Sequence, residues 1–237
     1  MKTPTLSTFA ATSLLFAIAS VSWAEDPLLF DRGLPLTNVN AEIEEDRSNI
    51  VLAPSPDLPD FLLGDDFRLP GNDHYKVTTI RVWAVGGDGT SMADASAELE
   101  NLILWGGLDN KPIAQIAENP IVTVAQYSDL QPIYIGTLGG QYLLYKVDFT
   151  VNLRIKGGKL FDFFVENEDD TPYLHASNAG KSGNVQQGAD DTILFLGPEG
   201  DIFTYQTSEG TRPTWDKDSD VNVQVFGTSD KKASKSK

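Results

Sequence analysis

The residues of this chain best suited to chemistry are clustered aspartates. Carboxylate oxygens are the preferred ligands of Ca²⁺, which takes about six to eight of them at roughly 2.3–2.6 Å. The candidate ligands are Asp65, Asp66, Asp169, Asp170, Asp190, Asp191, Asp218 and Asp220. Loops that meet at one end of a β-sandwich can bring such residues together, so one hypothesis is a structural calcium ion. The alternative is that these are solvated turns and strand ends, where aspartate is common.

One of these clusters begins like an EF-hand loop. Asp216, Asp218 and Asp220 alternate, as in the first half of that motif. The sixth position is then Val221, where the loop needs glycine, and the twelfth is Gly227, where it needs glutamate. The sequence therefore excludes an EF-hand and leaves only a calcium site of another kind.

Aromatic rings beside polar groups are the second chemical feature, because a glycan ligand needs an exposed aromatic face. Trp215 lies in a polar segment, and we predict it as a ligand-binding residue together with Tyr173 and His175. His175 alternates with apolar neighbours, so a structural role is its alternative. Trp83 and Trp105 lie in apolar strand contexts, which predicts that both pack in the core.

Residues for catalysis are few. The chain has two histidines and no cysteine, which excludes a zinc site of three histidines and a thiolate nucleophile. It has no His-Glu-x-x-His motif, Gly-x-Ser-x-Gly motif or phosphate-binding glycine loop. Paired carboxylates of a glycosidase cannot be ruled out among 34 acidic residues, so we predict no particular catalytic residue.

The elements that must position these residues are short strands separated by Gly, Pro, Asn and Asp. A helical period is nearly absent, and only residues 92–101 have the composition of a short helical turn. We predict an all-β fold, a single jelly-roll-like antiparallel β-sandwich with long loops. The predicted strands are residues 77–85, 99–105, 121–127, 133–138, 142–155, 160–165, 192–196, 202–206 and 221–226. We expect Gly106-Gly107 to end the second of these strands, residues 156–159 to form a hairpin turn into 160–165, and the three valines of 221–226 to share one face.

The start of the chain predicts an export signal. Lys2 precedes an apolar stretch at residues 9–21, and Ser22-Trp23-Ala24 places small residues at the two positions that a signal peptidase reads. The stretch is shorter than the roughly 20 apolar residues of a membrane-spanning helix. We therefore expect residues 1–24 to be a signal peptide and the protein to be secreted or periplasmic.

The remaining chain divides into a domain and a tail. Residues 25–227 are expected to form the β-sandwich, and residues 228–237 to be a disordered basic tail. No cysteine follows the signal and no apolar stretch ends the chain, so we expect no membrane anchor. The net charge of −16 repels phosphate backbones, which argues against nucleic acid as a partner.

Several short motifs resemble a known group of proteins. They are Phe30-Asp31-Arg32-Gly33, Gly64-Asp65-Asp66-Phe67, Trp105-Gly106-Gly107, His175-Ala176-Ser177-Asn178-Ala179 and Gln187-Gly188-Ala189-Asp190-Asp191. Together they resemble secreted bacterial β-sandwich proteins of uncharacterised function, similar to PEP-CTERM-type exported jelly rolls. The resemblance implies an extracellular protein associated with a surface, a matrix or carbohydrate, and it implies no catalytic residues. The basic tail departs from the sorting signal of that group.

Three functions follow as hypotheses. The first is a secreted, non-enzymatic binding or adhesion protein that contacts a glycan or a cell-surface or matrix component, assisted by calcium. The second is a glycan-active hydrolase or lyase on a jelly-roll scaffold. The third is a structural component of an extracellular matrix, joined through sheet edges. The sequence does not predict the oligomeric state, and the fold class alone cannot choose among the three hypotheses.

Overall fold

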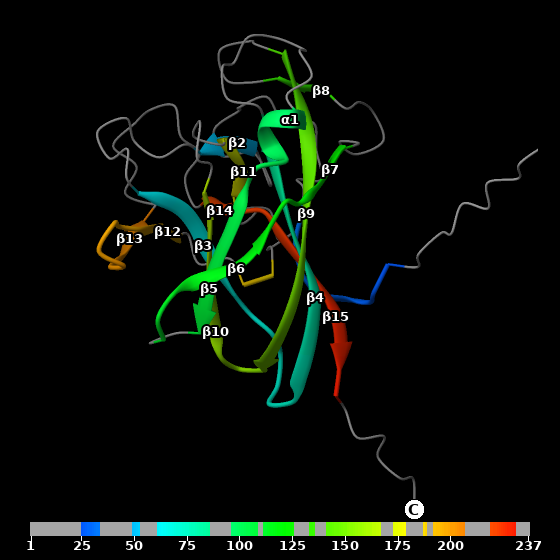
Figure 1. Cartoon of the computed structure of the whole chain (residues 1–237), viewed down its shortest axis with the longest axis vertical. Helices are drawn as coiled ribbons and strands as arrows, with labels where there is room; N and C mark the ends of the chain where they lie inside the picture. Colours follow the sequence, from blue (N-terminus) through cyan, green and yellow to red (C-terminus); the bar gives the residue numbers. More distant parts are fainter. Residues whose placement is uncertain are drawn as a thin grey trace, which may run out of the picture.

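The strands of the chain form two antiparallel sheets that face each other (Figure 1). The computed structural model describes residues 25–33, 49–52, 61–85, 96–108, 111–125, 133–135, 141–166, 173–178, 187–188, 192–206 and 219–230. Within these ranges the only helix is the single turn α1 (Ser96–Leu99), inside the predicted helical segment. The predicted all-β sandwich is confirmed. No helix in the described ranges is long and apolar enough to cross a membrane.

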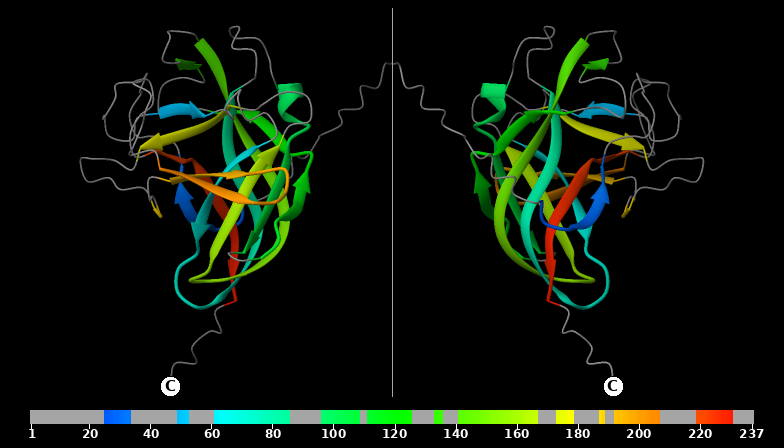
Figure 2. Two further views of the ribbon diagram at one scale, coloured as in Figure 1. Left: turned by 90° about the vertical axis from the view of Figure 1, so that its left-hand side faces the viewer. Right: turned by 90° about the vertical axis from the view of Figure 1, so that its right-hand side faces the viewer.

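The larger sheet is built on the long central strands β4 and β9, which pair along almost their whole length. Its main path runs β1-β15-β4-β11-β14, with β9 also on β4, β7 and β8 on β9, and β2 on β11. Figure 2 shows β15, β4 and β9 next to one another on this face. The bounds are β1 (Leu28–Arg32), β2 (Asn49–Leu52), β4 (His74–Val85), β7 (Ile121–Val124), β8 (Ile133–Ile135), β9 (Gln141–Lys156), β11 (Tyr173–Asn178), β14 (Ser219–Val221) and β15 (Val223–Ser229).

The smaller sheet has the strand order β13-β12-β3-β10-β5-β6. Its strands are β3 (Leu62–Arg68), β5 (Ile103–Leu108), β6 (Ala114–Glu118), β10 (Leu160–Glu166), β12 (Thr192–Leu196) and β13 (Ile202–Gln206).

Two predictions about the smaller sheet are corrected by the structure. Asp65 and Asp66 lie inside β3 rather than in a loop. The strand predicted at 99–105 is β5, which begins at Ile103 and runs through both glycines that were expected to end it.

Close packing explains why glycines continue through β5. A Cβ on Gly106 would lie 2.8 Å from the ring of Phe161, and one on Gly107 would lie 2.9 Å from the Pro112 carbonyl. A larger residue at either position would have to displace these neighbours. The glycines are therefore sites of close approach within a paired strand, and not strand terminators.

The turn after β9 joins the two sheets. The sequence predicts a hairpin here, and the turn forms, with Gly158 at φ +77°. The hairpin pairing is wrong, because β9 pairs in the larger sheet and β10 in the smaller. Gly157 N–H donates to the Asp73 carbonyl and Gly158 N–H to the Leu69 carbonyl, each at 2.8 Å. These bonds fasten it to the β3–β4 turn, which also crosses between the sheets.

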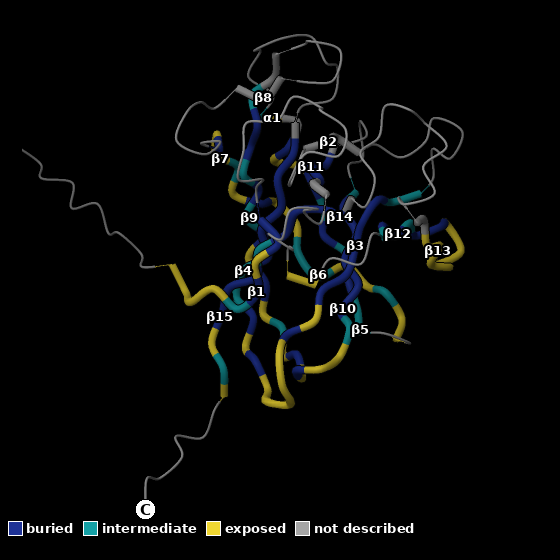
Figure 3. Tube along the Cα trace, turned by 180° about the vertical axis from the view of Figure 1, so that it is seen from behind, coloured by how far each residue is buried: buried dark blue, intermediate teal, exposed yellow. Residues whose placement is uncertain are grey.

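The core fills the space between the sheets (Figure 3). Every second side chain of β9 and β10 points inward, which is the period of a strand with one buried face. The same holds for β4 on either side of an irregularity between Val77 and Thr79, which shifts the alternation by one residue. Fully or almost fully buried members include Ile80, Val82, Val147, Phe149, Phe161 and Phe163. Val221, Val223 and Val225, predicted to share one face, all point into the core, each with 0% exposure. The single strand predicted at 221–226 is divided at Asn222 into β14, which ends at Val221, and β15, which begins at Val223. This strand continues to Ser229, two residues beyond the predicted end of the domain.

The segment before β1 is held on the larger sheet by polar contacts. Arg81 binds both carboxylate oxygens of Asp148, with N–O distances of 2.6 and 3.0 Å, and also binds Glu25. Thr78 Oγ1 donates to the Asp26 carboxylate at 2.6 Å. The first described residues are thus part of the folded domain.

Candidate functional site

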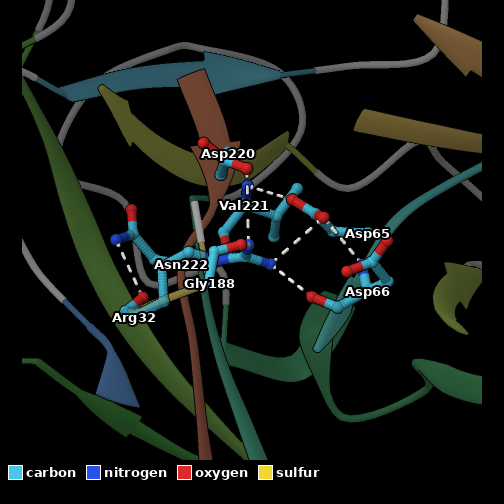
Figure 4. A network of polar contacts seen from close by, with 7 residues as sticks. All are labelled: Arg32, Asp65, Asp66, Gly188, Asp220, Val221 and Asn222. Atoms are coloured by element: carbon cyan, nitrogen blue, oxygen red, sulfur yellow. Dashed lines mark hydrogen bonds and ion pairs between the residues drawn. The ribbon is translucent and has the colours of Figure 1, made fainter. Parts of the chain in front are cut away.

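An arginine buried between the two sheets organises the acidic residues that sequence analysis singled out (Figure 4). Arg32 ends β1 in the larger sheet and has no exposed surface. Its Nη2 lies 3.1 Å from Asp65 Oδ1 in the opposite sheet, and its Nη1 lies 3.3 Å from Asp220 Oδ1 on β14. Both carboxylates are also fully buried. The guanidinium therefore joins the two layers as a buried ion-pair triad.

Backbone groups complete the coordination of Arg32. Nε donates to the Val221 carbonyl at 3.0 Å, Nη1 to the Gly188 carbonyl at 3.1 Å, and Nη2 to the Asp66 carbonyl at 2.6 Å. A guanidinium is suited to this place because it presents several donors in one rigid plane. Removing it would leave two buried carboxylates, the buried carbonyls of Val221 and Asp66 and the partly buried carbonyl of Gly188 without this donor.

Asp65 uses both carboxylate oxygens. Oδ1 accepts the Asp66 N–H and Oδ2 accepts the Val221 N–H, each at 2.6 Å. Burial raises the pKa of Asp65 well above its usual value, the charge of Arg32 opposes this, and the nearby carboxylates of Asp220 and Asp66 add to the rise. The group is therefore engaged as a structural acceptor between the sheets.

The arrangement bears directly on the calcium prediction. At Asp65 and Asp220 the guanidinium of Arg32 lies where a cation would bind. In the described part of the chain no three His, Cys, Asp or Glu side chains gather as a metal-binding group. The other predicted ligands, Asp169, Asp170, Asp190, Asp191 and Asp218, lie outside the described residues. Calcium stays a prediction for those five.

His175 belongs to the same buried region, on β11. Its Nδ1 lies 2.6 Å from Asn222 Oδ1, and the Asn222 N–H donates to the His175 carbonyl at 3.0 Å. Asn222 Nδ2 donates to the carbonyls of Arg32 and Gly33, so Oδ1 is the acceptor and His175 Nδ1 must carry the proton. Burial lowers the pKa of His175 to about 4, which keeps the ring neutral near pH 7.

Of the three predicted ligand-binding residues, the structure describes the side chain of His175 alone. His175 has no exposed surface, so it fills the structural role that the sequence left as the alternative. Tyr173 lies on β11, where its backbone pairs with Val85, and its side chain is not described. Trp215 lies outside the described residues.

A groove on the outer face of the smaller sheet was missed by sequence analysis. Strand alternation separates two faces there: Leu104 and Phe163 point into the core, whereas Trp105 and Phe164 belong to a second apolar cluster on the other side. The groove has a volume of about 450 Å³. Its walls include Leu62, Trp105, Pro112, Ile113, Glu166, Leu196, Pro198 and Glu199.

The prediction that Trp105 packs in the core is therefore wrong, whereas Trp83 is buried as predicted, with 4% exposure. Trp105 pairs with Phe164 on β10, which pairs with Gly64 on β3. A Cβ on Gly64 would lie 2.7 Å from Cδ1 of Phe164 and 1.8 Å from the Phe163 carbonyl oxygen. Glycine at this position lets the Phe164 side chain lie close against β3, beside the groove.

Trp105 is linked to a carboxylate in the groove. Its indole Nε1 donates to Glu166 Oε2 at 2.5 Å, which fixes the ring and the acid relative to each other. Across the groove Glu199 lies in the exposed β12–β13 turn, which is closed by Gly197 N–H to Asp201 O at 2.8 Å. The arrangement combines a partly buried indole, an apolar floor and two acceptors for hydroxyl or ammonium groups.

A signal for this site was present in the sequence. In residues 160–166 the aromatic and apolar Phe161, Phe163 and Val165 share one parity, whereas Asp162 and Glu166 share the other. That pattern places Glu166 on an outward face. It does not show which neighbouring strand lies beside it, so the contact with Trp105 was not predictable.

Comparison with protein-family models, with curated proteins and with solved structures found no match. Fold and site together define a β-sandwich protein with an aromatic, acidic groove on the outer face of one sheet.

Proposed function

We propose that this protein is a secreted or periplasmic, non-enzymatic β-sandwich that binds a glycan in the groove around Trp105. The observation that carries the proposal is the indole of Trp105, partly buried in an open groove and hydrogen-bonded to Glu166. A sugar ring has an apolar C–H face and a rim of hydroxyls. An aromatic face beside a fixed carboxylate matches both, because large apolar side chains with a few placed polar groups are typical of ligand sites.

The groove suits an extended chain ligand better than a small enclosed one. It is bounded by two turns, with Pro112 and Ile113 on one side and Pro198 and Glu199 on the other, and it is open to solvent. Secretion enters the proposal from the signal-like residues 1–24.

Binding is tested by titration calorimetry with oligosaccharides of N-acetylglucosamine, glucosamine, glucose and uronic acid. Trp105→Ala is expected to lower the affinity for the oligosaccharide that binds by at least about tenfold, which corresponds to ~1.4 kcal/mol of binding free energy. Ile121→Ala is the control, because it truncates an apolar residue that is accessible to solvent (62% exposed) but lies on β7, in the other sheet. If no member of the panel binds, or if Trp105→Ala binds as the wild type does, the proposal is overturned.

A hydrolase is the second candidate, favoured by the two carboxylates of Glu166 and Glu199 lining one groove. Retaining and inverting glycosidases use a pair of such groups at about 5–5.5 Å and about 6.5–9.5 Å respectively. Chromatography of an oligosaccharide incubated with the protein decides between a hydrolase and a binding protein. If the wild type releases shorter products and Glu199→Gln does not, although this variant still binds the oligosaccharide, the protein is a hydrolase. If the wild type leaves the oligosaccharide unchanged, the protein is a binding protein.

A further inference from the structure

We propose that the groove around Trp105 selects glycans that carry protonated amino groups, such as polymers of glucosamine. This inference rests on the proposed function and specifies its ligand class.

The charged side chains of the groove are all negative. Among the described residues that line it, Glu166 and Glu199 are the charged ones, and neither lysine nor arginine is among them. The whole chain has a net charge of −16, so the field around the groove is also negative. Uronate or sulfated glycans are repelled from such a site, and a cationic glycan is attracted to it.

The indole and its carboxylate can share one ammonium group. Glu166 Oε2 accepts the Trp105 N–H at 2.5 Å, and no residue in the described ranges donates to Oε1. An ammonium group over the indole face gains a cation–π interaction, for which tryptophan is the best side chain. The same group can donate to Oε1 in a charge-assisted hydrogen bond, which is stronger than the bond from a neutral hydroxyl.

The position of the groove disfavours a basic peptide as the ligand. An extended peptide gains affinity by pairing with a free sheet edge. Here the groove lies over β12, β3, β10 and β5, whose backbones are already paired with one another. Its floor offers the apolar side chains of Leu62 and Leu196, which suit the C–H faces of successive sugar rings.

The test compares two oligomers of equal length, one of glucosamine and one of N-acetylglucosamine, at low salt and at a pH where the free amine is protonated. The two differ in charge at each ring, because acetylation removes the amine's positive charge. We expect the glucosamine oligomer to bind about tenfold more tightly, the size of one cation–π contact with a charge-assisted bond. The preference is expected to shrink as salt rises.

Variants separate this inference from the proposed function. Glu166→Gln keeps an acceptor for the Trp105 N–H but removes the negative charge, so it should weaken binding of the glucosamine oligomer more than binding of the N-acetylglucosamine oligomer and thereby reduce the ratio of the two affinities. Glu100→Gln, at an exposed position beside α1, is the charge-matched control and should change neither affinity. Equal affinities for the two oligomers would overturn the charge inference and leave glycan binding intact. Tighter binding of an oligolysine peptide than of either oligomer would overturn the inference. If neither oligomer binds, the inference is overturned and the result also counts against the proposed function.

Discussion

Replacing Arg32 by methionine should remove a large part of the stability of this domain. The substitution keeps an apolar chain but leaves the fully buried Asp65 and Asp220 without their cation, and three carbonyls without their donor. Breaking a buried ion pair from one side costs about 3–5 kcal/mol, and buried acceptors left unsatisfied add to this. We expect a loss of at least about 4 kcal/mol, from a total of roughly 5–15 kcal/mol.

The loss is measured by urea unfolding followed through tryptophan fluorescence and by the thermal midpoint. For a domain of this size about 4 kcal/mol corresponds to a fall in Tm of roughly 8–16 °C. Arg154→Met is the matched control: Arg154 also pairs with an aspartate, Asp230 at 2.8 Å, but is 70% exposed. Such a surface pair contributes at most about 1 kcal/mol.

Two outcomes would refute this reasoning. If Arg32→Met loses no more than Arg154→Met, the triad does not stabilise the fold as its burial implies. If Asp65→Asn costs the same in the wild type and in the Arg32→Met background, the two residues are not coupled, because a double-mutant cycle on an interacting pair is non-additive.

Three further predictions concern protonation, packing and calcium. Because burial lowers the pKa of His175 to about 4 from an ordinary 6.5, its contribution is fully present above about pH 6.5 and is lost as the pH falls toward 4; His175→Gln should flatten this acid limb in urea unfolding. The contribution of Asp65 depends on pH in the opposite direction. Because its pKa is raised, its contribution is fully present below pH 3.8 and is lost as the pH rises, so the pH dependence of Asp65→Asn is measured separately. Gly64→Ala would place a Cβ 1.8 Å from the Phe163 carbonyl oxygen, and we expect a loss on the order of 3 kcal/mol. At Gly71 an added Cβ meets nothing within 4 Å, so Gly71→Ala costs only the backbone strain of its φ of +66°, about 1–2 kcal/mol; a loss in Gly64→Ala no larger than this would contradict the packing argument. Millimolar calcium after EDTA should raise Tm only through aspartates outside the described residues, so the response should persist in Asp65→Asn, and its loss there would show that calcium competes with Arg32.

Local pattern was enough to predict some elements and not others. The strand predicted at residues 142–155 became β9, Gln141–Lys156, because its alternation is long and uninterrupted. Strand β3 was missed because Gly64, Asp65 and Asp66 disfavour strands locally. They are tolerated there because Arg32 neutralises Asp65 and Phe164 packs over Gly64, and both partners are distant in sequence. The groove was missed for the same reason, since Trp105 and Glu166 meet only through strand pairing.

The contacts of Arg32 also set the order in which the domain can fold. Its bond to the Val221 carbonyl spans 189 positions, and β1 pairs with the last strand, β15. Folding is slow when contacts close such long loops. During synthesis β1 has no strand partner until β15 is made, and Arg32 has no bond to Val221, so the side of the core that these groups close stays open until late in translation. Mutual repulsion between chains of net charge −16 then opposes aggregation during this interval, which gives the acidity of the sequence a role before the fold exists.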